Sequence, residues 1–266
     1  MKITIIGAGN MGGAIVRGLV KGSLFKAEDI FVCDVNKEVL DALKKDIPRL
    51  NTEPNGYNSV SDTDIILLAV KPWLVDKVID RIKTKMDYGR QILVSIAAGV
   101  DIAALNTFLK KHSDENQSLA IFRIIPNTAI AIRKSVNLIA SDNASDTQKD
   151  LLLRIFNELG TAILLDESRL AAGTALTSCG IAYLFRYVRA AVSAGVEMGL
   201  YPKEAQNMLV ETMLGAAELL KSTGENPETE IDKVTTPGGI TIRGLNELEA
   251  NGFSNAVIKG IKAGRK

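Results

Sequence analysis

The chain has 266 residues, of which 46% are hydrophobic, and its formal net charge is +1. This length permits one large domain or two ordinary ones, and the hydrophobic content is enough for a substantial core. The near-zero charge disfavours nucleic acid as a partner, and no apolar run of the sequence is long enough to span a bilayer. Because the N-terminus leads directly into a strand pattern, we expect a cytoplasmic protein without a signal peptide.

Cysteine and histidine are scarce in this sequence. The two cysteines, Cys33 and Cys179, belong to no CxxC pair, so neither a disulfide framework nor a metal site is expected. The one histidine, His112, lies in a polar stretch that is typical of a loop. A Ser-His-Asp hydrolase or a histidine-assisted dehydrogenase would need this residue, so both classes are disfavoured.

The first twenty residues carry the most informative pattern. Residues 3–6 are an apolar, β-branched run, residues 7–12 read Gly-Ala-Gly-Asn-Met-Gly, and residues 13–19 have helical character. A G-x-G-x-x-G turn between a strand and a helix is typical of dinucleotide binding, where free N–H groups face the pyrophosphate. A second apolar run ends at Asp34, which is suitably spaced to accept hydrogen bonds from an adenosine ribose. The alternative is a glycine-rich turn in another kind of α/β protein.

Strand and helix patterns alternate as far as residue 165. Buried strands are expected at residues 64–70, 91–96 and 119–125, with further strands at 136–141 and 162–165 and a short one within 48–57. Helices are expected at residues 37–45, 72–82, 100–109 and 147–159. This alternation predicts a parallel sheet with right-handed crossovers.

Small or polar residues follow three of the expected strands. They are Ala69-Val70-Lys71-Pro72, Ala97-Ala98-Gly99 and Pro126-Asn127-Thr128. Ligands of open α/β sheets bind outside the carboxyl ends of the strands. The three clusters therefore predict one shared cleft.

The character of the sequence changes near Asp166. Residues 1–165 form the expected sheet domain, and residues 166–266 form an all-helical one with helices at 169–177, 181–198 and 202–220. Long Ala-rich helices with an excess of apolar faces predict that two copies associate as a homodimer.

A second turn suited to an anion lies in the helical half. Pro237-Gly238-Gly239 precedes Thr241 and an amphipathic segment, so backbone N–H groups at a helix N-terminus are offered to a carboxylate. A plain helix cap after a Pro-Gly turn is the equally weighted alternative.

Together these motifs resemble pyrroline-5-carboxylate reductase over residues 2–260. The resemblance is carried by residues 7–12, 69–72, 126–128, 175–183 and 235–241. It implies an α/β Rossmann-type N-terminal domain, an all-helical C-terminal dimerisation domain, and NADH or NADPH as cofactor. The implied reaction transfers a hydride to the cyclic imine 1-pyrroline-5-carboxylate and yields L-proline. The resemblance also implies homodimers that assemble into a larger ring.

The resemblance assigns the site residues as well. Gly239, Ile240 and Thr241 hold the substrate, with Thr241 as the catalytic residue. The cofactor residues are Gly7, Ala8, Gly9, Asn10, Met11, Gly12, Asp34, Ala69, Val70, Lys71, Pro72, Ala97, Ala98 and Gly99. No metal is implied.

Two features depart from the family pattern. The family usually has Ser-Gly-Ser-Gly-Pro-Ala-Tyr where residues 177–183 place Ser178 and Ile181 in the second and fifth positions. Family members that favour NADPH carry serine, threonine or arginine near the end of the second strand, where this chain has Asp34. A carboxylate repels a 2′-phosphate, so NADH is favoured, although Lys37 nearby weakens the preference.

Two other classes of function remain open. One is a related reductase of another imine or of a β-hydroxy acid, which usually relies on a lysine that residues 169–182 lack. The other is a non-catalytic nucleotide-binding protein, which would have no use for the second anion site.

Overall fold

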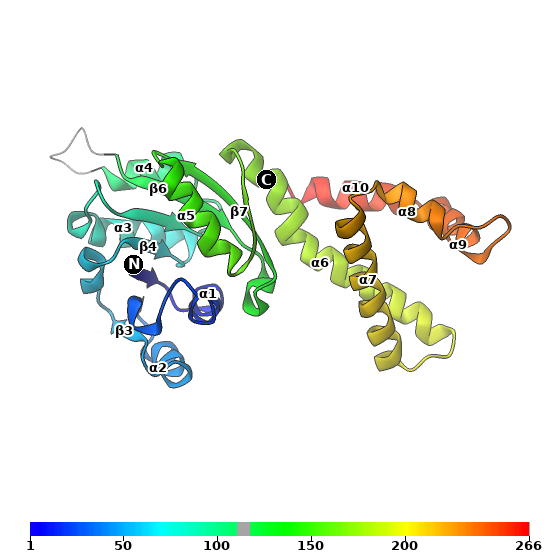
Figure 1. Cartoon of the computed structure of the whole chain (residues 1–266), viewed down its shortest axis with the longest axis horizontal. Helices are drawn as coiled ribbons and strands as arrows, with labels where there is room; N and C mark the ends of the chain where they lie inside the picture. Colours follow the sequence, from blue (N-terminus) through cyan, green and yellow to red (C-terminus); the bar gives the residue numbers. More distant parts are fainter. Residues whose placement is uncertain (111–117, 266) are drawn as a thin grey trace. The chain divides into compact units, whose positions relative to one another are not determined.

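The structure, a computed structural model, describes residues 1–110 and 118–265. The chain divides into two compact units, Met1–Ser178 and Cys179–Lys266. Figure 1 shows the sheet of the first unit in blue to green and the helices of the second in yellow to red.

The first unit is built on an eight-stranded sheet with the order β3-β2-β1-β4-β5-β6-β7-β8. Its strands are β1 (Ile3–Ile6), β2 (Ile30–Asp34), β3 (Asn51–Pro54), β4 (Ile65–Leu68), β5 (Ile92–Ser95), β6 (Ala120–Ile125), β7 (Ser135–Asp142) and β8 (Gly160–Leu164). The central strands are apolar and buried on both faces, as expected for a parallel sheet covered on both sides.

One strand pair corrects the expectation of an all-parallel sheet. β6 and β7 are antiparallel, with Phe122 opposite Ser141, whereas all other paired strands are parallel. The connection between them holds only the short 3-10 helix Thr128–Ile132, and a parallel pairing needs a longer crossover. The chain therefore turns back after β6, and Arg133 adopts a left-handed conformation with φ of 58° at that turn.

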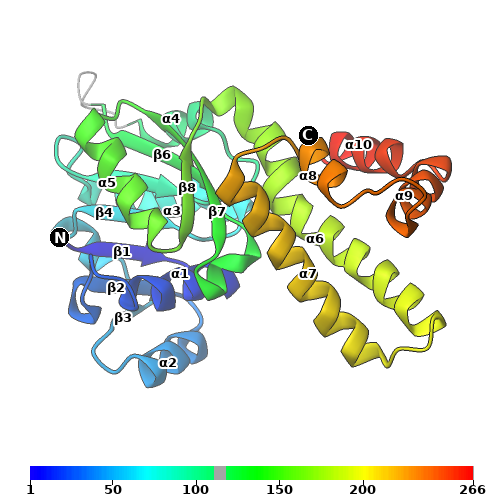
Figure 2. The same ribbon diagram turned by 45° about the vertical axis from the view of Figure 1, so that its right-hand side comes forward.

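Helices cover both faces of the sheet (Figures 1 and 2). One face packs on α1 (Asn10–Val20), α2 (Lys37–Asp46) and α5 (Asp146–Asn157) through a core that includes Leu19, Leu43 and Phe156. The other face packs on α3 (Val75–Ile82) and α4 (Ile102–Leu109). Pro72 begins a short 3-10 helix, Pro72–Leu74, which leads directly into α3.

The two helices expected at residues 169–177 and 181–198 are one continuous helix, α6 (Glu167–Glu197). Gly180 does not interrupt it, since a single glycine costs a helix only about 1 kcal/mol. Its first turns pack on the sheet unit: Leu170 is buried in that core, and Glu167 accepts hydrogen bonds from Arg123 at 2.8 Å and from the Ile102 N–H at 2.9 Å. The compact units accordingly divide inside α6, whereas the sequence places its boundary in the loop before this helix.

The second unit is helical throughout its regular structure. After α6 it contains α7 (Pro202–Thr223), α8 (Pro227–Lys233), α9 (Ile240–Ala250) and α10 (Phe253–Ala263). α8 and α10 are not among the helices expected from the sequence. Within residues 1–110 and 118–265, no helix combines the length and apolar content needed to cross a membrane.

Candidate active site

The register of the sheet brings several strand ends to one edge. Ile6 lies opposite Cys33 and Leu68, and Leu68 lies opposite Ser95. The next residues, among them Gly7, Asp34 and Ala69, therefore leave the sheet side by side. This is the carboxyl edge, where ligands of such sheets bind.

A cavity of about 700 Å³ opens at this edge, within the first unit. Its volume lies in the range of cofactor and substrate sites. The residues of the cofactor assignment that line it are Gly7, Gly9, Asn10, Met11, Asp34, Ala69, Val70, Lys71, Pro72, Ala97 and Ala98. The structure thus gathers residues from four separate strand ends around one space.

Three residues of that assignment do not line the cavity. Ala8 is buried beneath the turn, and Gly12 is buried against the turn from inside α1. Gly99 lies beyond Ala98 in the loop before α4, in a left-handed conformation with φ of 84°. Ala8 and Gly12 therefore support the glycine turn by packing inside the protein. Gly99 belongs to the loop that leads to α4.

The glycine turn fits a pyrophosphate. A Cβ built on Gly9 would have no atom of the described residues within 4 Å, so the backbone there is open to a ligand. A Cβ on Gly12 would lie 2.0 Å from the Gly7 carbonyl oxygen, so only glycine lets α1 pack this closely on the turn. No side chain among the described residues caps the start of α1 at Gly9. Its first N–H groups and the positive end of the helix dipole are available to an anion.

Asp34 is held rigidly at the end of β2. One carboxylate oxygen accepts a hydrogen bond from the Ala8 N–H at 2.6 Å, and the other accepts one from the Asn36 N–H at 2.8 Å. Each oxygen keeps a further lone pair, which suits a ribose diol. The carboxylate therefore both fastens the glycine turn and presents a fixed negative charge to the cavity.

The end of β6 borders the opposite side of the cavity. Pro126 lines it together with Thr174 and Ser178 of α6, and the Ser178 hydroxyl donates to the Pro126 carbonyl at 3.1 Å. Asn127 is buried: its side-chain oxygen accepts from the Ala129 N–H, and its amide donates to the Thr177 carbonyl at 3.2 Å. Of the cluster Pro126-Asn127-Thr128, only Pro126 faces the cavity, while Asn127 joins the strand end to α6.

Sequence reasoning missed several lining residues. Tyr57 comes from the loop after β3, and Lys77 and Arg81 come from α3. Cys33 lines the cavity from β2. Burial, and to a smaller extent the hydrogen bond to Glu53, raises the pKa of its thiol well above the usual value. Both effects favour the protonated thiol over the thiolate. None of these positions belongs to a recognisable sequence motif, because their neighbours come from distant parts of the chain.

The turn at residues 237–241, for which the sequence left an anion site and a plain helix cap open, lies in the second unit and leads into α9. Gly239 is the N-cap of α9, and its N–H donates to the Thr236 carbonyl at 2.9 Å. Gly238 has a φ of 70°, a conformation that favours glycine. Ile240 and Thr241 are exposed, with 81% of Ile240 accessible, so the N-terminal turn of α9 is open to a ligand. His112 lies outside the described residues.

Comparison with known proteins supports the division of the chain into a sheet part and a helical part. A family model described as "Pyrroline-5-carboxylate reductase dimerisation" matches residues 167–266. A second, described as "NADP oxidoreductase coenzyme F420-dependent", matches residues 2–99. The two matches correspond to the helical part and to the glycine-turn half of the sheet.

Individual relatives cover nearly the whole chain. Pyrroline-5-carboxylate reductase 1 of Dictyostelium discoideum is 36% identical over 97% of this chain, which spans only 48% of that longer protein. Pyrroline-5-carboxylate reductase 2 of the same organism is 33% identical over 98% of this chain and 89% of its own length. The crystal structure of Plasmodium falciparum pyrroline carboxylate reductase with NADP bound superposes with a TM-score of 0.84 at 27% identity, covering 99% of this chain and 95% of that one. The chain therefore belongs to the pyrroline-5-carboxylate reductase family and is an NAD(P)H-dependent oxidoreductase.

Proposed function

We propose that the protein reduces 1-pyrroline-5-carboxylate to L-proline with a reduced nicotinamide cofactor. The observation that carries the proposal is the cavity at the carboxyl edge, where the open backbone at Gly9 and the uncapped start of α1 offer a pyrophosphate site. The residues that would contact the cofactor are Gly7, Gly9 to Met11, Asp34, Ala69 to Pro72, Ala97 and Ala98.

The proposed reaction does not require a strong proton donor from the protein. When bound, the reduced nicotinamide supplies a hydride, which forms the new C–H bond at the C=N carbon. The C=N π electrons then become the lone pair of the amine nitrogen, so a protonated imine yields the neutral amine. Because a protonated imine is already a good electrophile, no strong general acid is needed. The residues of this chain bind, orient and desolvate the substrate.

We assign substrate binding to the start of α9. The backbone N–H groups of Ile240 and Thr241 would bind the substrate carboxylate, supported by the dipole of α9. Gly239, whose own N–H donates to the Thr236 carbonyl, would hold the turn that presents them. The Thr241 hydroxyl, which bonds to none of the described residues, would bond to the ring nitrogen and steady its proton.

The test is an activity assay that is run once with NADH and once with NADPH. Purified protein, 1-pyrroline-5-carboxylate and NADH or NADPH are mixed, and the absorbance of the reduced cofactor is followed. We expect oxidation of the cofactor with formation of proline, and loss of Thr241 should lower kcat roughly 100-fold, the cost of a missing transition-state hydrogen bond. Thr241→Ser should retain most of the rate, and Thr229→Ala, at an exposed position of α8, is the matched control.

An unchanged rate in Thr241→Ala would remove the role assigned to that hydroxyl. Cofactor binding without any turnover of the imine would instead favour a nucleotide-binding protein or a reductase of another substrate.

We further propose that NADH is preferred over NADPH. The support is the fixed carboxylate of Asp34 at the cavity wall, which would repel a 2′-phosphate. Lys37, the first residue of α2, is not among the residues that line the cavity, whereas Lys71, Lys77 and Arg81 are. The two lysines, Lys71 and Lys77, make NADPH a usable second cofactor.

We propose a homodimer formed through the helical half, in keeping with the family model named for dimerisation that matches it. Assembly of dimers into a larger ring and a cytoplasmic location stay predictions from the sequence.

A further inference from the structure

One end of the cavity contains an aromatic ring and a cation that the cofactor assignment leaves unused. Tyr57 and Arg81 both line the cavity, as do Asp34 and Val35 from the end of β2. Tyr57 follows β3, the strand that pairs with β2. In the sheet order, β2 is four strand positions from β6, a separation of about 19 Å at ordinary strand spacing. If Asp34 receives the adenosine ribose, this end of the cavity belongs to the adenine.

The two side chains form a cation–π pair. The guanidinium carbon of Arg81 lies 6.0 Å from the centroid of the Tyr57 ring. Arg81 occupies the last turn of α3, and Tyr57 precedes the 3-10 helix Asn58–Asp62, so the pair joins two elements on the rim of the cavity. At 6.0 Å the contact is at the outer limit of such interactions, so the two side chains hold each other only weakly.

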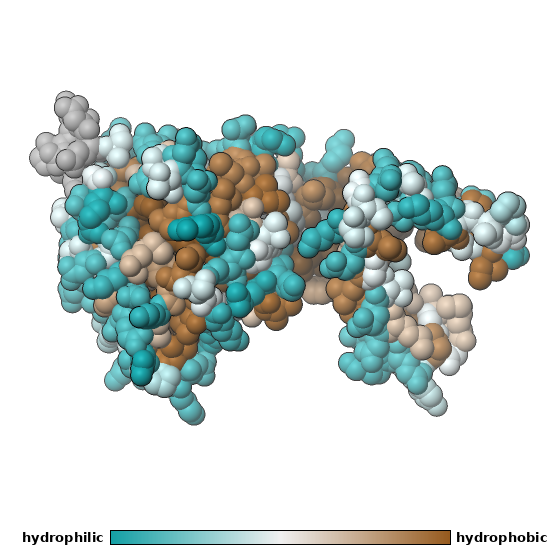
Figure 3. All heavy atoms as spheres, viewed as in Figure 1, coloured by the Kyte–Doolittle hydropathy of each residue, from teal (hydrophilic) through white to brown (hydrophobic). Residues whose placement is uncertain are grey.

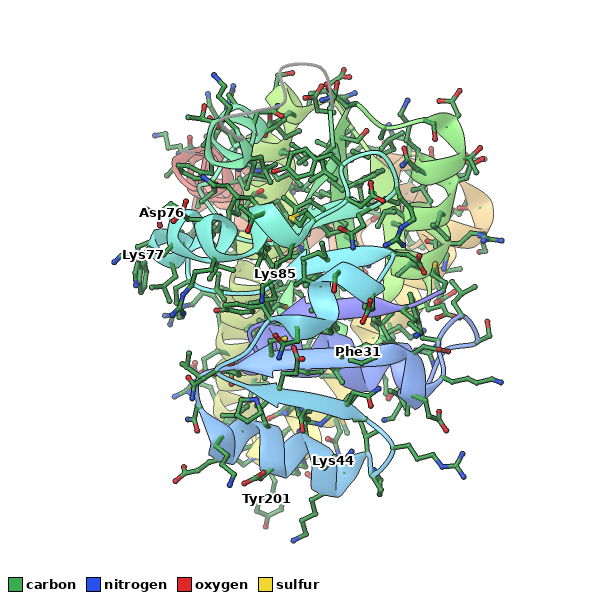
Figure 4. The ribbon with its side chains drawn as sticks, turned by 90° about the vertical axis from the view of Figure 1, so that its left-hand side faces the viewer. Phe31, Lys44, Asp76, Lys77, Lys85 and Tyr201 are labelled. Atoms are coloured by element: carbon green, nitrogen blue, oxygen red, sulfur yellow. The ribbon has the colours of Figure 1, made fainter. Side chains whose placement is uncertain are left out.

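The Tyr57 loop is anchored by its neighbours. Glu53 accepts hydrogen bonds from the Asn58 N–H at 3.1 Å and from the Ser59 hydroxyl at 3.0 Å, and the Lys85 ammonium donates to the Tyr57 carbonyl at 3.5 Å. Figure 4 shows Lys85 after α3 and Lys77 on α3 itself. The backbone at Tyr57 is thus fixed by hydrogen bonds, and its side chain lines the cavity.

Arg81 makes no ion pair with the described residues. Its neighbour Asp80 is instead paired with Lys83 at 2.8 Å. An arginine that keeps its charge beside an aromatic ring is suited to stacking on a neutral π system. A 2′-phosphate is the other candidate ligand for this cation, but Asp34 on the same side of the cavity disfavours a second negative charge.

We propose that Tyr57 and Arg81 bind the adenine ring of the cofactor and contribute equally to the affinity for NADH and NADPH. This inference rests on the proposed cofactor site. It extends that site to two residues that belong to none of the sequence motifs.

Binding is measured directly by calorimetry with ADP-ribose, 2′-phospho-ADP-ribose and nicotinamide mononucleotide, without substrate. We expect Tyr57→Ala and Arg81→Ala each to raise the Kd of both adenine-containing ligands by the same factor, on the order of tenfold. The Kd of nicotinamide mononucleotide should stay unchanged, and Tyr57→Phe should bind ADP-ribose like the wild type because it keeps the ring. Arg49→Ala, an exposed arginine outside the cavity, is the matched control.

Thermal melting followed by circular dichroism checks that each variant is folded, and Tyr57→Leu, which also lacks the aromatic ring, replaces Tyr57→Ala if the alanine variant is not. Unchanged ADP-ribose binding in folded Arg81→Ala would overturn the proposal. A loss confined to 2′-phospho-ADP-ribose would overturn it too, since Arg81 would then bind the phosphate. If the wild type binds neither adenine ligand, the proposed function fails; if the wild type and the variants bind alike, only the adenine assignment fails.

Discussion

The glycines of the turn after β1 have different roles, which follow from the atoms around each of them. Gly9 faces open space, and Gly12 is pressed against the Gly7 carbonyl. Asp34, distant in sequence, completes the arrangement by accepting the Ala8 N–H. The spacing of the glycines predicts this turn, but which glycine serves the ligand and which serves packing is visible only in the folded chain.

Alanine at Gly9 should affect cofactor binding, whereas alanine at Gly12 should affect stability. Gly9→Ala should fold normally and lose cofactor affinity about tenfold or more, because its methyl group enters the space offered to the pyrophosphate. Gly12→Ala should lower the melting temperature, because its methyl group would meet the Gly7 carbonyl and displace α1. Melting curves and NADH titrations separate the two effects; a strongly destabilised Gly9→Ala would contradict the assignment.

Charge at Asp34 should set the choice between the two cofactors. Asp34→Asn keeps an acceptor for the Ala8 N–H and removes the negative charge, so kcat/KM for NADPH relative to NADH should rise on the order of tenfold. Asp41→Asn, an exposed residue of α2, is the control. An unaltered ratio in Asp34→Asn would show that this carboxylate does not select the cofactor.

At the scale of elements, local patterns predict most of the first unit. The apolar runs at β1, β4 and β5 and the amphipathic pattern of α2 lie where the sequence places them. Two elements differ for reasons outside their own sequence. β7 runs antiparallel to β6 because the connection is short, and α6 is unbroken because packing of its first turns outweighs the weak preference of Gly180.

The junction between α1 and α5 depends on one carboxylate. Glu158, at the end of α5, accepts hydrogen bonds through one oxygen from the Ser23 N–H at 2.5 Å, the Ser23 hydroxyl at 2.8 Å and the Leu24 N–H at 3.2 Å. A Cβ on Gly22 would lie 2.0 Å from the other oxygen, so the loop after α1 closes tightly around this side chain.

Removing that carboxylate should loosen the loop. Glu158→Ala should lower the free energy of unfolding by about 1–2 kcal/mol, because the Ser23 and Leu24 N–H groups lose their acceptor. Glu158→Gln retains an acceptor and should lose less. Asp150→Ala, exposed on the same helix, should change nothing measurable in urea denaturation. A Glu158→Ala variant as stable as Asp150→Ala would rule out this anchoring role.

At the scale of the whole molecule, the second unit exposes too much apolar surface for a helical unit that stays alone. Large hydrophobic side chains on α6 and α7 are exposed, among them Leu184, Phe185, Met208 and Leu214. Figure 3 shows brown, hydrophobic residues on these helices. Exposed patches of this kind mark interfaces between proteins.

Charge placed on this surface should separate the copies. Phe185→Glu and Leu214→Glu should each shift the molar mass from twice that of the chain toward that of one chain, because a buried unpaired carboxylate destabilises an interface. Light scattering coupled to size exclusion measures the mass, with Lys221→Glu, an exposed charged position of α7, as control. A wild-type protein with the mass of one chain at micromolar concentration would exclude the dimer.

The sequence by itself determined the features that depend on neighbours along the chain: the glycine turn, the buried strands, the cap at Gly239 and hence the nucleotide-binding class. Only the tertiary structure decided which distant residues meet. Glu158 reaches Ser23 across 135 positions, Arg81 approaches Tyr57 on the rim of the cavity, and β7 reverses against β6. These contacts arise when helices pack on a sheet, and a pattern read along one segment carries no information about the partner that another segment brings to it.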